Sequence, residues 1–205
     1  SRHANVVSSL LDAGVRLVGK TNMDEFALGS TGETSQFGPT VNPRDAEVER
    51  ATGGSSSGSA AAVASGVADA ALGSDTGGSV RIPASLCGIV GFKPSWGVVP
   101  RNGFVGAAYT LDTIGPLARD VMTVARVMDV IAGPDRRDPS TERAQRLPVG
   151  EFASRSGDPP AIEELSLAVP DECLHDVTPA VQERIENVLD GLADDEAVGD
   201  AGGMV

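Results

Sequence analysis

The pattern of apolar and polar positions predicts alternating helices and strands from the start of the chain. Apolar residues at helical spacing predict a helix over residues 4–13 that ends at Gly14, and the apolar run 15–18 predicts a short strand. Residues 21–50 are rich in Gly, Thr, Asn and Pro and predict a long loop with a short helix near residues 23–28. Because so long a connection is uncommon in a compact domain, this loop is a candidate for function.

The alternation continues through the middle of the chain. Small residues over 58–65 predict a helix that packs closely against a sheet, and residues 70–73 and 88–92 predict short buried strands. Asp120 is a favourable N-cap for a helix over residues 121–132. Helices and strands that alternate in this way indicate an α/β fold with a central β-sheet flanked by helices.

The last third of the chain is less regular. Residues 135–164 are polar and predict a surface excursion, residues 165–169 predict a strand, and Thr178 with the proline after it opens a helix. The tail, residues 193–205, shows no β alternation, where an α/β unit normally supplies a returning strand. Because the chain also opens directly on a helix, we expect a single domain that is truncated at both ends.

Composition and charge narrow the class of protein. A chain of 205 residues is long enough to bury a core, and its 25 glycines with only 3% aromatic residues are typical of a tightly packed α/β protein. A net charge of -13 disfavours direct binding to nucleic acid. Lysine-poor, acidic surfaces are typical of proteins that stay soluble at high salt, although a merely acidic protein fits equally well.

Cysteine usage and hydropathy indicate the compartment. Cys87 and Cys173 lie far apart and match no metal-ligand spacing, so we expect buried thiols in a reducing environment, with no metal and no cofactor. No apolar run is long enough to span a membrane, and the first residues lack the apolar run of a signal peptide. We therefore expect a cytoplasmic protein without a membrane partner.

Residues 53–85 contain two glycine-serine clusters, which several interpretations fit. Gly53 and Gly58 have the spacing of a P-loop, but Ser59 and Ala60 stand where Lys and Ser or Thr are needed. A flexible linker does not usually continue into a helix and a buried strand. Close backbone packing alone is a further interpretation, and it stays open.

The second cluster also fits a nucleophile. Ser79 follows Thr76, Gly77 and Gly78, and consecutive glycines after a strand let backbone N–H groups converge on an oxyanion. The G-x-S-x-G elbow of α/β-hydrolases is not present, because Arg81 replaces its second glycine.

A histidine base is not indicated, because His3 and His175 are predicted to lie at the surface. A neutral lysine can serve instead, with a second serine to relay the proton. The candidates are Lys20 and Lys93 for the base and residues 55–57 for the relay.

The chain resembles the amidase signature family, in which these motifs occur in the same order. The resemblance covers a core motif region, residues 6–140, so residues 1–205 are expected to form a partial amidase signature domain. The segments that carry it are GKTNMDEF (19–26), GGSSSGSA (53–60), GSDTGGSVRIPA (73–84), GFKP (91–94) and LDTIGP (111–116).

The resemblance implies a central mixed β-sheet flanked by helices and a Ser-cisSer-Lys triad that cleaves carboxamide C–N bonds. Ser79 matches the nucleophile that forms the acyl-enzyme, and Ser55 matches the bridging serine. In the family the peptide bond between that serine and the preceding glycine, here Gly54, is cis. A small amide is the implied substrate.

The resemblance also assigns supporting roles around the nucleophile. The backbone N–H groups of Thr76, Gly77, Gly78 and Ser79 match the oxyanion hole. Asp75 and Arg81 are expected to hold that loop in shape, and Arg81 facing an acidic substrate is the alternative.

Two departures limit what the resemblance implies. The first is that the family's lysine lies upstream of the GKTNMDEF motif and corresponds to neither Lys20 nor Lys93, so the triad lysine is missing from this chain. The second is the short C-terminal side, where family members continue with the substrate-pocket half of the sheet.

Three functions therefore stay open. The first is a stand-alone amidase. The second is the glutaminase subunit of glutamyl-tRNA(Gln) amidotransferase, which would act on glutamine with companion subunits that bind tRNA and ATP. The third is an inactive fragment.

Overall fold

The computed structural model describes residues 3–45, 47–142, 150–158, 160, 166, 168–170, 172 and 174–194. By its contacts the chain divides into two units, Ser1–Gly157 and Asp158–Val205, and each unit is described by itself.

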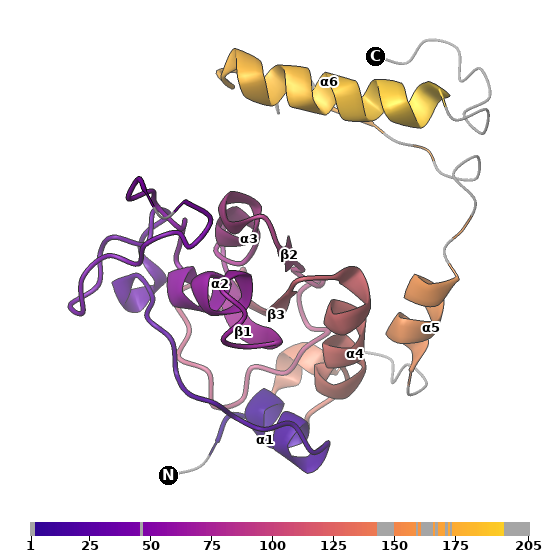
Figure 1. Ribbon diagram of the computed structural model, residues 1–205. Coiled ribbons are helices and arrows are strands. Elements are labelled where there is room, and N and C mark those ends of the chain that lie inside the picture. The colour runs from indigo at the N-terminus through magenta and orange to yellow at the C-terminus, as the bar shows by residue number, and fades with distance from the viewer. Residues whose placement is uncertain are drawn as a thin grey trace. The chain divides into compact units, whose positions relative to one another are not determined.

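A three-stranded sheet lies at the centre of the first unit, in the order β1-β3-β2 (Figure 1). Strand β1, Ala70–Asp75, and strand β2, Val90–Gly91, both pair antiparallel with β3, Thr113–Ala118. The predicted strands at 70–73 and 88–92 are confirmed, the second in a shorter form. Strand β3 was not predicted, because Gly115 and Pro116 suggest a turn rather than a central strand.

One face of the sheet is covered by two helices. Helix α2, Ser57–Ala64, and helix α3, Arg81–Cys87, lie beside the sheet (Figure 1). Both pack against Leu117 of β3 in a cluster of buried residues. The small residues of α2 allow the close approach that the sequence predicts. Helix α3 was not predicted as a helix, because it begins directly after the second glycine-serine cluster and contains Pro83.

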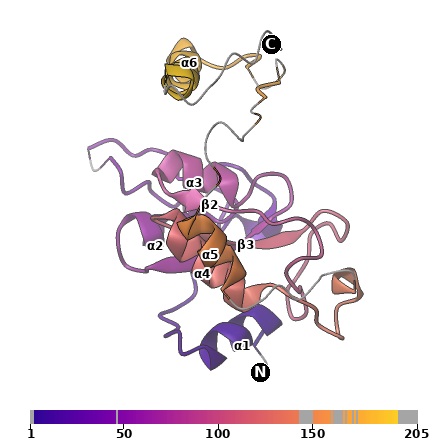
Figure 2. The same ribbon diagram turned by 90° about the vertical axis from the view of Figure 1, so that its right-hand side faces the viewer.

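The opposite face is covered by helix α1, Asn5–Asp12, and helix α4, Val121–Ile131 (Figure 2). Ile114 of β3 points to this side, as the two-residue period of a strand requires for a residue three positions from Leu117. The predicted N-cap of α4 is confirmed: the Asp120 side chain accepts a hydrogen bond from the Thr123 N–H at 2.7 Å.

The connections differ from the predictions at two places. Residues 15–18 are exposed and form no strand among the described residues, because no neighbouring strand pairs with them. The polar excursion contains the 3-10 helix η2, Pro139–Thr141, and helix α5, Glu151–Gly157, whose first turn is held by Asp129 through the Phe152 N–H at 2.8 Å. The short helix predicted near residues 23–28 is the 3-10 helix η1, Glu25–Ala27.

The second unit contains helix α6, Pro179–Asp194, which confirms the helix predicted after Thr178. Of the strand predicted at 165–169, residues 166, 168 and 169 are described and form no strand, and residues 165 and 167 lie outside the described residues. Most of the tail 193–205 also lies outside them.

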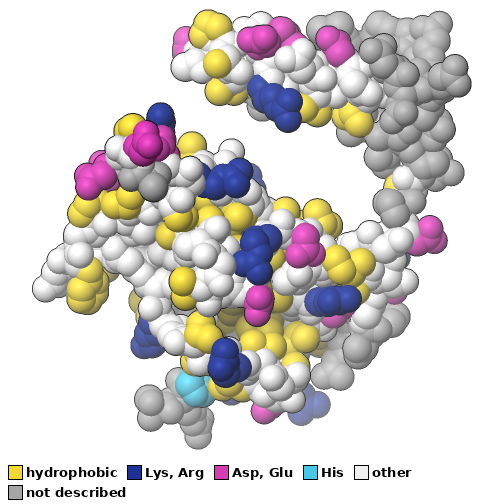
Figure 3. All heavy atoms as spheres, viewed as in Figure 1, with side chains coloured by type: hydrophobic (Ala, Val, Ile, Leu, Met, Phe, Trp, Pro, Cys, Tyr) yellow, Lys and Arg dark blue, Asp and Glu magenta, His cyan; other side chains and the backbone are white. Residues whose placement is uncertain are grey.

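Figure 3 shows hydrophobic side chains open to solvent between scattered charged ones on one face of the first unit. Phe26, Phe37 and Val105 are the most exposed, at 83%, 91% and 91%. Within the described residues, no helix combines the length and the apolar character needed to cross a membrane.

Leu117 is fully buried between β3 and helices α2 and α3. We expect Leu117→Ala to lower the free energy of unfolding by about 2–5 kcal/mol, because the change leaves a cavity at the centre of the sheet. Urea unfolding followed by circular dichroism measures the loss. Leu86→Ala, at a side chain that is 51% exposed, is the control and should cost less than about 1 kcal/mol. Equal losses for the two variants would contradict this core.

Candidate active site

The first glycine-serine cluster forms a buried turn that leads into α2. Ser55 is completely buried, and the peptide bond between Gly54 and Ser55 is cis. The loop that precedes the cluster holds this turn by backbone hydrogen bonds. The Gly54 N–H donates to the Ser30 carbonyl at 2.8 Å, and the Asp24 N–H donates to the Ser55 carbonyl at 3.1 Å.

The carboxylate of Asp24 organises that loop. It is completely buried and accepts hydrogen bonds from the Gly32 N–H at 3.0 Å and from the Thr34 N–H and hydroxyl at 2.9 Å each. It also lies against Gly54, where a Cβ would overlap Asp24 Oδ2, so only glycine fits there. Sequence reasoning missed this role of Asp24, although the residue stands in the GKTNMDEF motif.

Ser56 joins the two clusters to each other. Its N–H donates to the Ser79 carbonyl at 3.1 Å, and its hydroxyl lies 3.3 Å from the Ser74 carbonyl and 3.2 Å from the Ser74 nitrogen. At Gly73 a Cβ would come within 2.5 Å of Ser56 Oγ, so the strand beside this contact has no room for a side chain. The structure therefore brings the turn that contains Ser55 next to Ser79.

The second cluster is a tight turn between β1 and α3, and Ser79 in it is 8% exposed. The buried carboxylate of Asp75 accepts hydrogen bonds from the Gly78 N–H at 2.7 Å and the Val80 N–H at 3.2 Å. The Gly78 N–H is therefore already bound to Asp75, whereas the resemblance assigns it as a donor in the oxyanion hole. The N–H groups of Thr76, Gly77 and Ser79 have no acceptor within the described residues.

Asp75 also forms an ion pair with Arg81. This contact fits the expectation that the two residues hold the loop of Ser79 in shape. The guanidinium Nε lies 3.0 Å from Asp75 Oδ2, and Nη2 lies 3.0 Å from Oδ1. Burial raises the pKa of the Asp75 carboxyl, but the hydrogen bonds from Arg81, Gly78 and Val80 outweigh it and hold the pKa below its usual range. The carboxyl is therefore ionised at neutral pH.

A second carboxylate holds the other end of the turn. The Thr76 hydroxyl donates to Asp112 Oδ1 at 2.6 Å, and Asp112 Oδ2 accepts from the N–H groups of Ala107 and Ala108 at 2.8 and 2.9 Å. Asp112 is 1% exposed. Its role was not predicted, although it stands in the LDTIGP motif.

No base contacts the serines among the described residues. Ser55 Oγ is buried without a hydrogen-bond partner. Lys20 is exposed, and Lys93 Nζ donates to the carbonyl of its neighbour Pro94 at 2.9 Å. His3 is also exposed. The arrangement thus offers a hydroxyl, a second hydroxyl on the adjacent turn and free backbone N–H groups, which are the parts that acyl transfer needs beside a base.

Comparison with known proteins gives the family. A profile described as Amidase matches residues 1–199. The chain belongs to the Amidase family. It is similar to the A subunit of glutamyl-tRNA(Gln) amidotransferase from Symbiobacterium thermophilum, with 52% identity over 187 residues that cover 91% of this chain and 37% of the relative. The corresponding protein of Halobacterium salinarum is 52% identical over 191 residues, which cover 93% of this chain and 44% of the relative.

Solved structures show the same fold. The structure of the corresponding amidotransferase protein from Thermotoga maritima matches with a TM-score of 0.83 and 46% identity, over 93% of this chain and 41% of that chain. Native peptide amidase from Stenotrophomonas maltophilia matches with a TM-score of 0.77 and 33% identity, over 92% and 40%. The chain spans less than half the length of these relatives.

We expect Asp75→Asn to lower the free energy of unfolding at pH 7 by about 2–4 kcal/mol, because the neutral amide replaces a buried acceptor of several N–H groups. The folded-state pKa of Asp75 is lowered, so this stabilisation is present above the range where a free aspartate titrates and is lost as the pH falls through the folded-state pKa. The difference between parent and variant should therefore shrink in acid. Urea unfolding over a pH series measures it.

Asp69→Asn is the matched control. Asp69 also faces an arginine, with 3.4 Å to Arg119 Nη2, but its side chain is 98% exposed. This variant should change stability by less than about 1 kcal/mol at any pH. An Asp75→Asn variant as stable as the parent at pH 7 would show that the carboxylate does not hold the turn.

Proposed function

We propose that this chain carries the acyl-transfer part of a serine amidohydrolase, with Ser79 as the nucleophile and Ser55 as the bridging serine. The observation that carries the proposal is the pair of Ser56 contacts, which join the turn of Ser55 to the turn of Ser79. The ion pair of Asp75 and Arg81, which holds the turn of Ser79, also supports it.

The proposed reaction cleaves a carboxamide C–N bond in two steps. A neutral lysine, supplied by the segment that carries it in the family, withdraws the Ser79 proton through the Ser55 hydroxyl. Ser79 Oγ then forms a bond to the amide carbon, and the carbonyl oxygen takes the negative charge. The C–N bond breaks as the nitrogen gains a proton, and water later hydrolyses the acyl-enzyme.

The oxyanion needs N–H donors that are not already engaged. Thr76, Gly77 and Ser79 meet this condition within the described residues, and the hydroxyl bond from Thr76 to Asp112 holds the first of them in place. The Gly78 N–H donates to Asp75, and it becomes a fourth proposed donor when it leaves Asp75 on substrate binding.

Glutamine is the substrate that the comparisons favour over other small amides. Both curated relatives described above bear the name of a glutamyl-tRNA(Gln) amidotransferase subunit, whereas the peptide amidase matches at lower identity. On this proposal the protein releases ammonia from glutamine and works with companion amidotransferase subunits. The second candidate function is that of a stand-alone amidase. The fold that this chain shares with peptide amidase favours it.

A chimera tests the assignment of the serines. The chain is joined to the flanking segments of the Halobacterium salinarum relative, which restores the full length, and glutamine hydrolysis is measured as ammonia release. Ser79→Ala and Ser55→Ala should each lower kcat by at least about 10³-fold, because each removes a member of a triad that acts as a unit.

Ser65→Ala, at an exposed serine that ends α2, is the control and should keep the parent activity. A Ser79→Ala chimera that folds and retains activity would rule out Ser79 as the nucleophile. An active chimera that hydrolyses acetamide but not glutamine would instead favour the stand-alone amidase.

The 205 residues alone should show no measurable hydrolysis of glutamine or acetamide, because no lysine contacts Ser55 within the described residues. Ammonia release at micromolar protein concentration measures this. Turnover that disappears in Lys20→Ala would show that Lys20 is the base and would contradict the proposed role of a lysine outside these residues.

A further inference from the structure

Arg101 lies in a hollow that neither Ser55 nor Ser79 lines. Its side chain is only 7% exposed, and its guanidinium lies 5.0 Å from the ring centroid of Trp96 and 4.5 Å from that of Tyr109. One nitrogen, Nη1, donates to the backbone carbonyls of Tyr109 and Asp112. The aromatic rings and these carbonyls hold the guanidinium in one orientation.

The other two nitrogens of the Arg101 guanidinium, Nε and Nη2, are buried and have no hydrogen-bond partner within the described residues. In Arg81 the same two nitrogens, Nε and Nη2, donate side by side to the two oxygens of the Asp75 carboxylate. The Nε and Nη2 edge of Arg101 is therefore also a pair of parallel N–H donors. Asp138 Oδ2 is 3.9 Å from Nε, which is too long for a hydrogen bond. A buried donor pair without an acceptor is costly, and a ligand would remove that cost.

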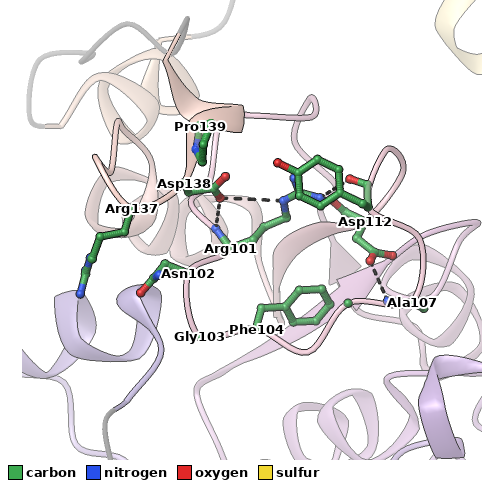
Figure 4. A pocket seen from close by; sticks show the side chains of 11 residues that line it. Arg101, Asn102, Gly103, Phe104, Ala107, Asp112, Arg137, Asp138 and Pro139 are labelled. Atoms are coloured by element: carbon green, nitrogen blue, oxygen red, sulfur yellow. Dashed lines mark hydrogen bonds and ion pairs between the residues drawn. The ribbon is translucent and has the colours of Figure 1, made fainter.

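Arg101 lines a hollow with a volume of about 490 Å³ (Figure 4). Gly103, Gly106 and Ala107 contribute small residues to its wall, and the ring of Phe104 lies below Arg101 in the view. The space is sufficient for a small organic group. The Tyr109 ring lies over the guanidinium and its residue is 64% exposed, so access of a ligand to the buried Nε and Nη2 donors requires this exposed ring to turn aside.

The charges of the hollow disfavour an anion. Two buried carboxylates, Asp138 and Asp112, line the hollow together with Arg101 and Arg137. Because Arg137 already pairs with Asp135, Arg101 alone balances the two carboxylates, and an anion would add a further negative charge beside them. A neutral group must therefore supply the acceptor. Within the described residues Asp138 Oδ2 accepts only the backbone N–H of Arg101, at 2.6 Å, and has a lone pair to spare for a donor from the same group.

We propose that this hollow is a binding site for a primary carboxamide, placed between the Nε and Nη2 donors of Arg101 and Oδ2 of Asp138. The carbonyl oxygen of the carboxamide accepts from the guanidinium edge, and the N–H on the same side donates to Asp138. At the 3.9 Å separation of Nε and Oδ2, the O–C–N edge lies alongside the two atoms, with its oxygen facing Nε and its N–H facing Oδ2. A peptide unit does not fit equally well, because its N–H points away from its oxygen. The site does not depend on the proposed function.

The test uses the 205-residue chain labelled with ¹⁵N and titrated with acetamide, N-methylacetamide or acetate at constant ionic strength. The Arg101 Nε–H signal and the indole signal of Trp96, the one tryptophan of the chain, report on the hollow. Acetamide should shift both signals with saturation, and it should bind more tightly than either other probe. Arg101→Lys keeps the charge but loses the donor pair, so the Trp96 shift should then need at least about tenfold more acetamide.

Arg137→Lys is the matched control, because Arg137 lines the same hollow but pairs with Asp135 and its side chain is 58% exposed. It should leave the acetamide titration unchanged. Asp138→Asn should remove the preference for acetamide over N-methylacetamide. Three results would overturn the proposal: no saturable shift in the parent, an equal response to acetate, or the same acetamide titration in a folded Arg101→Lys variant. The probe comparison in the parent decides the question even if a variant fails to fold.

Discussion

The hydrogen bonds of Ser56 are the contact on which the rest of the site depends. Its N–H donates a hydrogen bond to the Ser79 carbonyl. Its hydroxyl forms hydrogen bonds with the backbone carbonyl and N–H of Ser74, near the end of β1. These hydrogen bonds fix the two glycine-serine clusters side by side, although helix α2 and strand β1 separate the clusters in the sequence. The contact requires helix α2 and strand β1 to approach closely. Gly73, which has no side chain, and the small residues of α2 allow this approach.

Buried carboxylates, rather than regular secondary structure, shape the turns around the two serines. Asp24 holds the loop that supports Ser55, Asp75 holds the turn of Ser79, and Asp112 anchors Thr76. Each accepts several donors, and such donors keep a carboxylate in place despite its burial. Within the described residues, the N–H groups left free in the Ser79 turn are those that no carboxylate binds.

Among the described residues, local sequence signals predicted α1, α2, α4 and α6 but missed α3 and α5, and they were less reliable for the strands. The N-cap at Asp120 and the small residues of α2 are local features, and both helices form where the sequence indicates. Strand β3 was missed because its sequence contains Pro116, and only its two partners make it the central strand. Residues 15–18 have strand-like residues but no partner in the described part of the chain. Motif resemblance identified the serines as candidates, whereas the roles of Asp24 and Asp112 needed the three-dimensional contacts.

We propose that Ser55 and Ser79 form one reacting pair, which Ser56 holds together. A crystal structure of the full-length chimera after reaction with a fluorophosphonate tests this pairing. We expect a covalent bond between phosphorus and Ser79 Oγ, and a phosphoryl oxygen that accepts hydrogen bonds from the N–H groups of Thr76 and Gly77. Ser55 Oγ should lie within hydrogen-bonding distance of Ser79 Oγ. A phosphonate bound to another residue, or a Ser55 hydroxyl directed away from Ser79, would contradict it.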